Sequence, residues 1–426
     1  MSNKPERLFN DTFGGLQPTD YNACVGNNGF QDTEAYTRGY IEAAMALLDE
    51  VARKEAHESN IDDIVYPISF CIRHSLELCL KGAIESLKVI KETQEIKEYK
   101  LSSTHNIGEL WEFYRKQSEN IDRRYLDINQ RLAEYVNDIF QIDPNGQTFR
   151  YPVDLSDEKH LTSTPIISLL RLRIRFKELA KLIYELIFAN RHLREEYSIG
   201  TFIRNLSRYD LYLIACQLPC IDHWKNPEFN NTKESIKEHF SISSRTLSKA
   251  IKTIENHYEL SSLIGIEKTI NNITLENIVI YINQWERYHN DKTTKGHNFS
   301  FESIIYNNNL ERECIDQCKS KMCLEAIAAI HALYELGRES FPIYSELYQG
   351  LYNSSLSDLQ HAYQNDRDVE EISHYFSKTS LKTYIFRALQ VLGQKNIYHN
   401  LKENFKDLAE MPSFDITRNF PYPFNY

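Results

Sequence analysis

Hydrophobic positions in this chain recur mostly three or four residues apart, which is the spacing of one helix face. The clearest case runs from Pro67 to Leu87, where the apolar residues line one face of a predicted helix. Arg73, Glu77 and Lys81 follow each other at intervals of four beside that face, which predicts a row of ion pairs along the helix. A row of polar residues beside the core-facing side of a helix is a place where a helical bundle can hold a binding or catalytic site.

The same spacing predicts four more helices in the N-terminal part, which makes residues 31–196 one bundle-type domain. Residues 1–30 are rich in Gly, Asn, Asp and Thr and predict an irregular arm. The run Thr104-His105-Asn106 before IGELWEF predicts a capped helix start, and the run Asp-Pro-Asn-Gly from residue 143 predicts a turn. The five predicted helices cover residues 32–56, 67–87, 107–116, 121–142 and 165–190.

Residues 197–426 predict a helical C-terminal region, so the whole chain is expected to be all-α. The totals agree, because 14 Gly and 12 Pro among 426 residues favour long helices over many strands and tight turns. The predicted C-terminal helices cover residues 206–218, 233–240, 243–257, 275–289, 311–337, 343–351, 355–364, 368–376 and 380–410.

The stretch 232–257 is close to the pattern of a helix-turn-helix pair, with a turn predicted at 241–243. In that arrangement Arg245, Lys249 and Lys252 would face a groove of nucleic acid. Helix-turn-helix geometry is also common in proteins that never contact nucleic acid, so plain helical packing is the alternative for this pair.

The overall charge of −11 argues against a protein coated with positive charge for bulk nucleic-acid or anionic-membrane binding, while leaving room for a local basic groove. The chain lacks an apolar run approaching the roughly 20 residues of a membrane span. Its first residues lack the apolar core of a secretory signal. We therefore expect a cytoplasmic protein that does not associate with membranes.

The eight cysteines are expected to be reduced in that compartment. The pairs Cys216/Cys220 and Cys314/Cys318 are four residues apart, and the CxxC spacing of zinc ribbons is absent, so small core residues are favoured over a metal site. We expect no metal and no cofactor. The sequence also lacks the GxxxxGK[ST], GxGxxG, HExxH and GxSxG motifs of several large enzyme classes.

Three strings in the N-terminal region, RHSLELCLKGAI, THNIGELW and DPNGQTFRYP, resemble the HEPN superfamily of prokaryotic helical bundles. The resemblance covers about residues 35–190. It implies a four- or five-helix bundle that is often a dimer and acts in phage defence such as abortive infection, in toxin–antitoxin systems or in RNA processing. It also implies RNA as a candidate partner, together with a protein partner from the same defence operon.

Catalytic members of this superfamily are metal-independent ribonucleases that carry Arg, then four to six residues, then His. The arginine stabilises the charge of the phosphorane, and the histidine takes part in proton transfer from the ribose 2′-hydroxyl. Arg73 and His74 are adjacent and depart from that spacing, whereas Arg367 and His374 are the chain's only match, a number that chance alone explains. The candidate catalytic sets are thus Arg73 with His74 and His105, and Arg367 with His374. Arg150 is a third candidate for phosphate binding, in the same pocket as Arg73 and His105.

Two classes of function follow. The first is an antiviral-defence or toxin-type protein that acts on RNA, by binding or by metal-independent endoribonuclease cleavage. The second is a non-enzymatic regulator or scaffold that contacts nucleic acid or a partner protein through residues 230–257. An inactive bundle used for dimerisation or for sensing RNA or a nucleotide also fits the departure from the catalytic spacing. For the row of Arg73, Glu77 and Lys81, the alternative to a functional site is a purely structural ladder of ion pairs on one helix, beside a histidine near a helix start.

Overall fold

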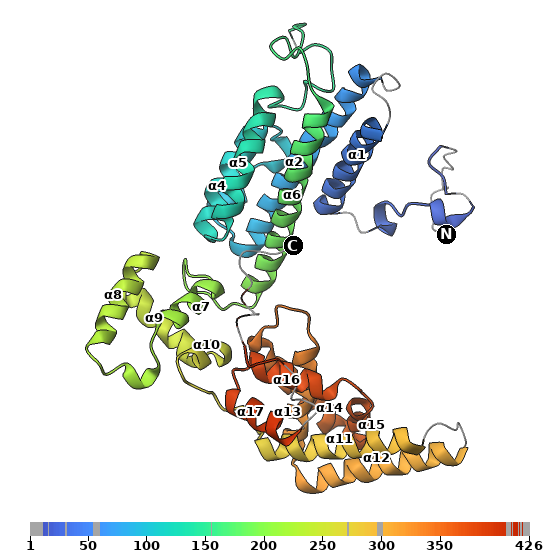
Figure 1. Cartoon of the computed structure of the whole chain (residues 1–426), viewed down its shortest axis with the longest axis vertical. Coiled ribbons are helices and arrows are strands. Elements are labelled where there is room, and N and C mark those ends of the chain that lie inside the picture. Colours follow the sequence, from blue (N-terminus) through green and yellow to red (C-terminus); the bar gives the residue numbers. More distant parts are fainter. Residues whose placement is uncertain are drawn as a thin grey trace, which may run out of the picture. The chain divides into compact units, whose positions relative to one another are not determined.

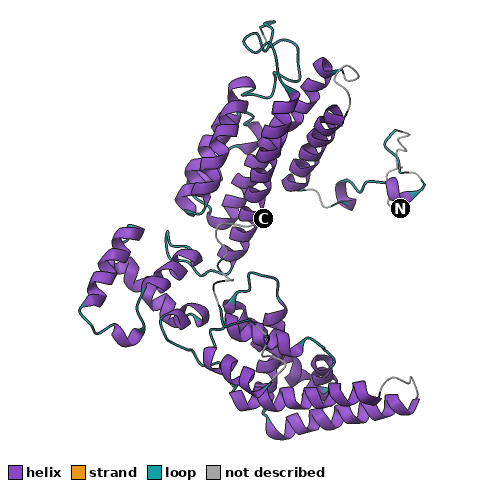
Figure 2. Cartoon of the chain, viewed as in Figure 1, coloured by secondary structure: helices purple, strands orange, loops and turns teal. Residues whose placement is uncertain are grey.

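The protein is helical throughout the part that the structure describes, and its helices are joined by loops and two isolated antiparallel bridges (Figure 2). The all-α prediction is confirmed. Within this part of the chain, every helix is too short or too polar to cross a membrane. The structure is a computed structural model that describes residues 12–15, 17–29, 32–53, 60–154, 156–270, 272–295, 301–405, 410, 412–415, 417 and 420.

The chain divides into two compact units, Met1–Arg194 and Glu195–Asn425, here called unit 1 and unit 2 (Figure 1). Residues 12–15 and 17–29 of the predicted arm are mostly exposed and contain two short 3-10 turns, Thr19–Tyr21 and Gly26–Asn28. The rest of the predicted arm lies outside the described residues.

Unit 1 is a bundle of long helices (Figure 1). Its α1 packs along α2, and α4 packs between α2 and α5. The chain then returns through a long loop, residues 143–168, into α6. The helices of unit 1 are α1 (Thr33–Arg53), α2 (Ile61–Lys91), α3 (Gln94–Glu98), α4 (Ile107–Ile121), α5 (Tyr125–Ile142) and α6 (Leu169–Ser198).

Two predicted helix starts in unit 1 were placed at prolines and were wrong. Pro67 lies inside α2, which begins six residues earlier at Ile61, and α6 begins at Leu169 rather than at Pro165. Proline favours the first helical position, but here other residues set both starts. At α6, for example, Ser168 accepts the backbone N–H of Arg171 at 3.3 Å and so caps the first turn.

Unit 2 contains two hydrophobic cores. The first core is formed by α7 (Arg208–Gln217), α8 (Glu228–Phe240), α9 (Ser244–Asn256) and α10 (Tyr258–Leu263). The second is formed by α11 (Leu275–Lys295), α12 (Phe301–Lys321), α13 (Leu324–Arg338), α14 (Tyr348–Gln364), α15 (Asp368–Phe376), α16 (Leu381–Val391) and α17 (Lys395–Asn404).

Helix α13 is the centre of the second core, because most of its residues are buried. Its sequence is rich in alanine, so neighbouring helices can approach closely. At Gly337 a Cβ atom would collide with the carbonyl of Tyr384 on α16, which shows that this approach requires glycine.

Three predicted boundaries in unit 2 were wrong. The run 311–337 is two helices, because the chain breaks at Met322 and Cys323 between α12 and α13. The segments 343–351 and 355–364 are largely one helix, α14, preceded by the 3-10 turn Ser345–Leu347. The segment 380–410 is split into α16 and α17 by Gly393, whose φ of +66° ends the first helix.

A buried ion cluster joins the two cores of unit 2. Arg208 on α7 donates from Nε to Glu346 at 3.0 Å and from Nη2 to Glu259 on α10. His257 Nε2 lies 2.8 Å from Glu346, while His257 Nδ1 accepts the backbone N–H of Leu260 at the start of α10. Burial alone would raise the pKa of Glu346, but the charge of Arg208 and the contact of His257 hold this pKa well below its ordinary value.

Aromatic rings close this cluster. The guanidinium carbon of Arg208 lies 5.1 Å from the ring centre of Tyr344 and 4.6 Å from that of Phe420. These are cation–π distances. Arg208 and Glu259 are both buried, so the cluster fixes α7 and α10 against the turn that carries Glu346.

Candidate functional site

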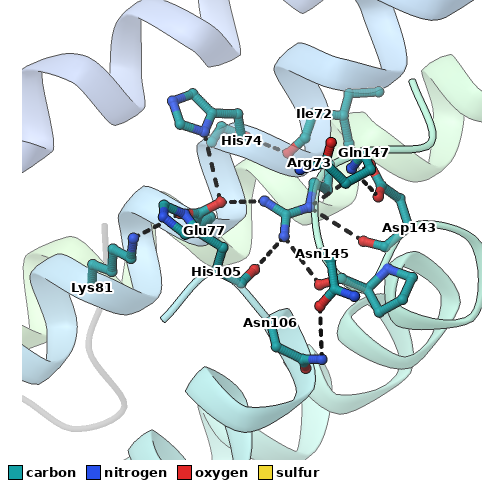
Figure 3. Close-up of polar contacts among 12 residues, drawn as sticks. Ile72, Arg73, His74, Glu77, Lys81, His105, Asn106, Asp143, Asn145 and Gln147 are labelled. Atoms are coloured by element: carbon teal, nitrogen blue, oxygen red, sulfur yellow. Dashed lines mark hydrogen bonds and ion pairs between the residues drawn. The ribbon is translucent and has the colours of Figure 1, made fainter. Parts of the chain in front are cut away.

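The predicted ion row on α2 is confirmed. Arg73 donates from Nη1 to Glu77, and Lys81 Nζ donates to Glu77 Oε1 at 2.8 Å. Arg73 and Glu77 are buried, whereas Lys81 is partly exposed. The row therefore runs from two buried side chains to a partly exposed one, and Figure 3 shows its contacts.

The loop that follows α5 supplies most of the remaining partners of Arg73. Its Nε donates to the carbonyl of Asp143 at 3.2 Å, and its Nη2 donates to the carbonyls of Pro144 at 3.1 Å and His105 at 2.5 Å. Because Nη1 is bound to Glu77, all three guanidinium nitrogens are engaged (Figure 3). Arg73 thus holds together three segments that are far apart in the sequence.

Two residues shape that loop around the guanidinium. Asp143 Oδ1 accepts the backbone N–H groups of Gln147 at 2.9 Å and Thr148 at 3.2 Å, which closes the turn. Gly146 has a φ of +75°, and a Cβ there would lie 3.1 Å from the guanidinium carbon of Arg73. Both the backbone angle and the close approach favour glycine.

The start of α4 fixes the position of His105. The predicted cap is confirmed, since Asn106 Oδ1 accepts the N–H groups of Gly108 at 3.0 Å and Glu109 at 3.1 Å. Asn106 Nδ2 also donates to Asn145 Oδ1 at 3.0 Å, which ties this helix start to the loop around Arg73. His105, one residue before the cap, is therefore held beside α2.

Two imidazoles meet at the carboxylate of Glu77. His105 Nδ1 lies 2.9 Å from Oε1, and His74 Nδ1 lies 3.8 Å from Oε2. Burial alone would raise the pKa of Glu77, but the contacts of His74 and Lys81 and the charge of Arg73 lower this pKa well below its ordinary value. An ionised carboxylate can only accept, so Nδ1 of His105 carries the proton and donates it to Glu77.

The second nitrogen of His105 is free of this network. The His105 side chain is 60% exposed and that of His74 is 27% exposed. The site therefore combines a buried ion pair, Arg73 with Glu77, and three partly or largely exposed side chains around it, His74, His105 and Lys81.

Arg150 lies near His74, with the ring of Phe70 as the group that contacts both. Phe70 stacks on His74 with ring centres 5.3 Å apart and planes 14° apart, while the edge of Tyr40 meets the same imidazole at 4.5 Å. The guanidinium of Arg150 is exposed and lies 5.9 Å from the ring centre of Phe70. Arg150 thus adjoins His74 through an aromatic ring.

The second candidate pair, Arg367 and His374, lies in unit 2. Arg367 directly precedes α15 and His374 lies in its last turn, and both side chains are exposed. Seven residues of helix place them on a similar face but about 10 Å apart along the axis.

The predicted basic residues of the 232–257 segment lie on one face of α9. Thr246, Leu247, Ala250 and Ile254 are buried on the opposite face. Ser243 caps this helix by accepting the N–H of Thr246 at 3.2 Å, and Ser241 forms the preceding turn with a φ of +52°. The exposed face carries Arg245, Lys249 and Lys252.

The prediction that the paired cysteines are core residues is confirmed for Cys314 and Cys318, which are buried in the second core of unit 2. It is wrong for Cys216 and Cys220, which are exposed, as is Cys323. Over the described ranges, His, Cys, Asp and Glu side chains form no group of three or more that could hold a metal ion.

Comparison of the chain with known protein families, curated proteins and solved structures gave no significant match. The resemblance to the HEPN superfamily stays a prediction from the three strings quoted above. Sequence reasoning also missed several site residues, namely Asp143 and Gly146 as the cover of Arg73, and Tyr40 and Phe70 beside His74. The Asp-Pro-Asn-Gly turn was the one signal for the first two.

Proposed function

We propose that this protein is an antiviral-defence or toxin-type protein that cleaves RNA without a metal ion, at a HEPN-like site formed by His74, His105 and Lys81. One observation carries the proposal: two accessible imidazoles are oriented by the same buried, ionised carboxylate, Glu77. Cleavage of RNA through its 2′-hydroxyl requires one group that takes a proton and another that gives one, and imidazoles suit both roles near neutral pH.

Arg73 takes a different part from the one that the superfamily resemblance implies. Its nitrogens are bound to Glu77 and to three carbonyls, so it is a positioning residue that keeps Glu77 charged and holds the loop and the start of α4 in place. Lys81, which is partly exposed beside the same carboxylate, then supplies the positive charge that faces the phosphate.

The reaction uses these groups in one displacement. His105 accepts the proton of the 2′-hydroxyl at Nε2, because its Nδ1 proton is held by Glu77. The 2′-oxygen attacks phosphorus while the 5′-oxygen of the next nucleotide leaves with a proton from His74. Lys81 stabilises the charge that develops on the non-bridging oxygens. The products are a 2′,3′-cyclic phosphate and a free 5′-hydroxyl.

The test is cleavage of labelled RNA by the purified protein in the presence of EDTA. We expect His105→Ala and His74→Ala each to lower the rate by about 100-fold or more. Products should carry 2′,3′-cyclic phosphate, and a substrate with 2′-deoxyribose at the cleavage position should resist. In bacteria, expression of the wild type should degrade RNA and slow growth, and expression of either variant should not.

Two further variants sharpen this test. His361→Ala removes another exposed histidine, on α14, and should leave cleavage unchanged. His374→Ala tests the pair Arg367 and His374. Loss of cleavage in His374→Ala, with full activity in His105→Ala, would move the site to α15. Absence of any cleavage by the wild type would refute the proposal.

A second candidate function is a non-enzymatic regulator that contacts nucleic acid or a partner protein through α8 and α9, arranged as a helix-turn-helix pair. The observation that favours it is the exposed row of Arg245, Lys249 and Lys252 opposite the buried face of α9. If this row binds nucleic acid, Arg245→Glu combined with Lys249→Glu should weaken a salt-dependent affinity at least 10-fold, and Lys395→Glu on α17 should not.

A further inference from the structure

The start of α2 and the loop after α5 form a second surface beside His74. Tyr66, Phe70 and His74 are spaced four residues apart on α2, so they lie along one helix face. This row of rings leads from the helix start to the imidazole that the proposed reaction uses. Tyr66 is 46% exposed, so the row is open at its outer end.

A cavity of about 510 Å³ lies at that outer end. Its size is within the roughly 300–1,000 Å³ range of small-ligand pockets. The cavity is bordered by Tyr66 on α2 and by loop residues that include Arg150, Tyr151, Lys159 and His160. Tyr151 is 49% exposed, so two aromatic side chains present accessible surface to one cavity.

Arg150 connects this cavity to His74. Its guanidinium carbon is 5.3 Å from the ring centre of Tyr151 and 5.9 Å from that of Phe70, and its Nη2 donates to Tyr151 Oη at 3.3 Å. Phe70 in turn stacks on His74. A planar cation between two rings offers both a stacking surface and a charge for a phosphate.

The loop that carries these residues has its own internal hydrogen bonds. Asp154 Oδ1 accepts the N–H groups of Ser156 at 2.7 Å and Glu158 at 3.0 Å, and Val153 and Lys159 form an isolated bridge. The loop therefore presents Tyr151 and Lys159 on a closed turn.

We propose that the cavity bordered by Tyr66, Arg150 and Tyr151 binds an unpaired base and so makes single-stranded RNA the substrate of this protein. The inference rests on the proposed function, because it assigns the nucleotide next to the one cleaved at His74. Exposed aromatic rings and arginine planes are the groups on which unstacked bases are held in single-stranded RNA complexes. A base within a duplex is stacked on its neighbours and cannot enter such a cavity.

The positive charge at the cavity predicts how RNA binding depends on salt concentration. Arg150 and Lys159 are the cations that border the cavity, and the chain as a whole is acidic. Binding should therefore depend on stacking more than on phosphate contacts. With about two phosphates neutralised on a single strand, the slope of log affinity against log salt should be about −1.4.

The experiment measures binding of a short fluorescent 2′-O-methyl RNA, which cannot be cleaved through its ribose, to the full chain. The same strand in a duplex and a strand with abasic sites serve as comparison probes. We expect the wild type to prefer the single strand with bases over both other probes. Tyr66→Leu and Tyr151→Leu should each weaken single-strand binding by roughly 5- to 150-fold. Tyr363→Leu, at a 63% exposed tyrosine on α14, should not change it.

The outcomes separate this inference from the proposed function. If cleavage depends on His74 and His105 but the tyrosine variants bind and cleave normally, the base site is wrong and the ribonuclease assignment stands. If single strands bind through the tyrosines and are never cleaved, the base site stands and the cleavage assignment fails. Equal binding of the duplex, the abasic strand and the intact strand, or no binding of the single strand, overturns the base site.

Discussion

Two buried arginines, Arg73 in unit 1 and Arg208 in unit 2, are surrounded in different ways. Arg208 is bound by two carboxylates, Glu259 and Glu346, and is covered by aromatic rings. Arg73 is bound by the carboxylate of Glu77 and by three backbone carbonyls, and its Nε lies 3.9 Å from the carboxylate of Asp143. The partners of Arg208 mostly contact one another in the interior, whereas Glu77 links Arg73 to exposed side chains.

The difference separates a structural ion cluster from a site. Glu346 lies among partners that are mostly buried, so its charge serves to fix α7 and α10. Glu77 also has several polar partners, but two of them are imidazoles with solvent-exposed atoms. A charged group in the core becomes useful to chemistry when its network ends at groups that can exchange protons with a ligand.

The largest expected effect is from Arg208→Ala. The variant would leave buried Glu259 and half-buried Glu346 without the guanidinium that they share, which should lower the free energy of unfolding by about 3–5 kcal/mol. Urea unfolding and hydrogen exchange in α7 and α10 measure the change. Arg338→Ala, at an exposed arginine paired with half-buried Glu335, should change stability by less than about 1 kcal/mol. Equal effects of the two variants would contradict the description of a buried cluster.

Arg73→Ala should have a smaller effect on stability, about 2–4 kcal/mol, because Glu77 keeps Lys81 and His105 as partners. Its hydrogen-exchange signature should appear in residues 143–148 and at the start of α4, and RNA cleavage should fall as His105 loses its support. Arg115→Ala, at an exposed pair with Glu112, is the matched control. A variant that keeps full stability and loses only RNA affinity would make Arg73 a ligand of the phosphate instead.

Buried His331 in unit 2 provides a pH test that sharpens the contrast with the exposed imidazoles of unit 1. His331 stacks on Tyr375 with ring centres 3.7 Å apart, and burial lowers its pKa to about 3. The unfolded imidazole takes up a proton below about pH 6.5, whereas the folded one does so only near pH 3, so stability falls as the pH decreases through this window.

At pH 5 this loss should reach about 2 kcal/mol relative to neutral pH. His331→Gln removes the titrating group and should flatten the dependence by that amount in urea unfolding at the two pH values. His361→Gln, at an exposed histidine, should retain the slope of the wild type. An unchanged slope in His331→Gln would show that His331 takes up its proton in the folded state as readily as in the unfolded one.

The smallest expected effect is from Asn106→Ala, which removes the cap of α4 and should cost about 1 kcal/mol. Asn106→Asp keeps the capping oxygen but loses the bond to Asn145, so it should preserve most of the stability. If cleavage falls in both variants, the link between α4 and the loop positions His105. If it falls in Asn106→Ala alone, the cap is sufficient.

Local patterns in the sequence predicted the local features correctly. The spacing of Arg73, Glu77 and Lys81 predicted the ion row, because residues four apart on a helix are neighbours whatever the tertiary fold. Asn106 before an apolar helix predicted the cap for a similar reason. Helix type was equally predictable, since hydrophobic periodicity depends only on nearby residues.

The burial of Arg73 could not be predicted in this way. It depends on residues 143–146 returning to α2 about 70 positions later, and nothing in the neighbourhood of Arg73 encodes that return. The break between α12 and α13 was missed because the run 311–337 keeps good helix formers on both sides of it. Arg150 was expected in the Arg73 pocket, but its place beside Phe70 likewise follows from the path of the long loop.

The close fit of Gly146 over Arg73 implies a pair of residues by which homologues of this protein could be recognised. A side chain at position 146 would have an unfavourable backbone angle and would crowd the guanidinium of Arg73. A smaller residue at position 73 would remove that crowding, and with it one reason for glycine at 146. The two positions should therefore be inherited as a pair, even where the exposed residues around Glu77 have diverged. A search for sequences that retain both, at a separation of about 70 residues, would gather relatives that overall similarity is too weak to reveal.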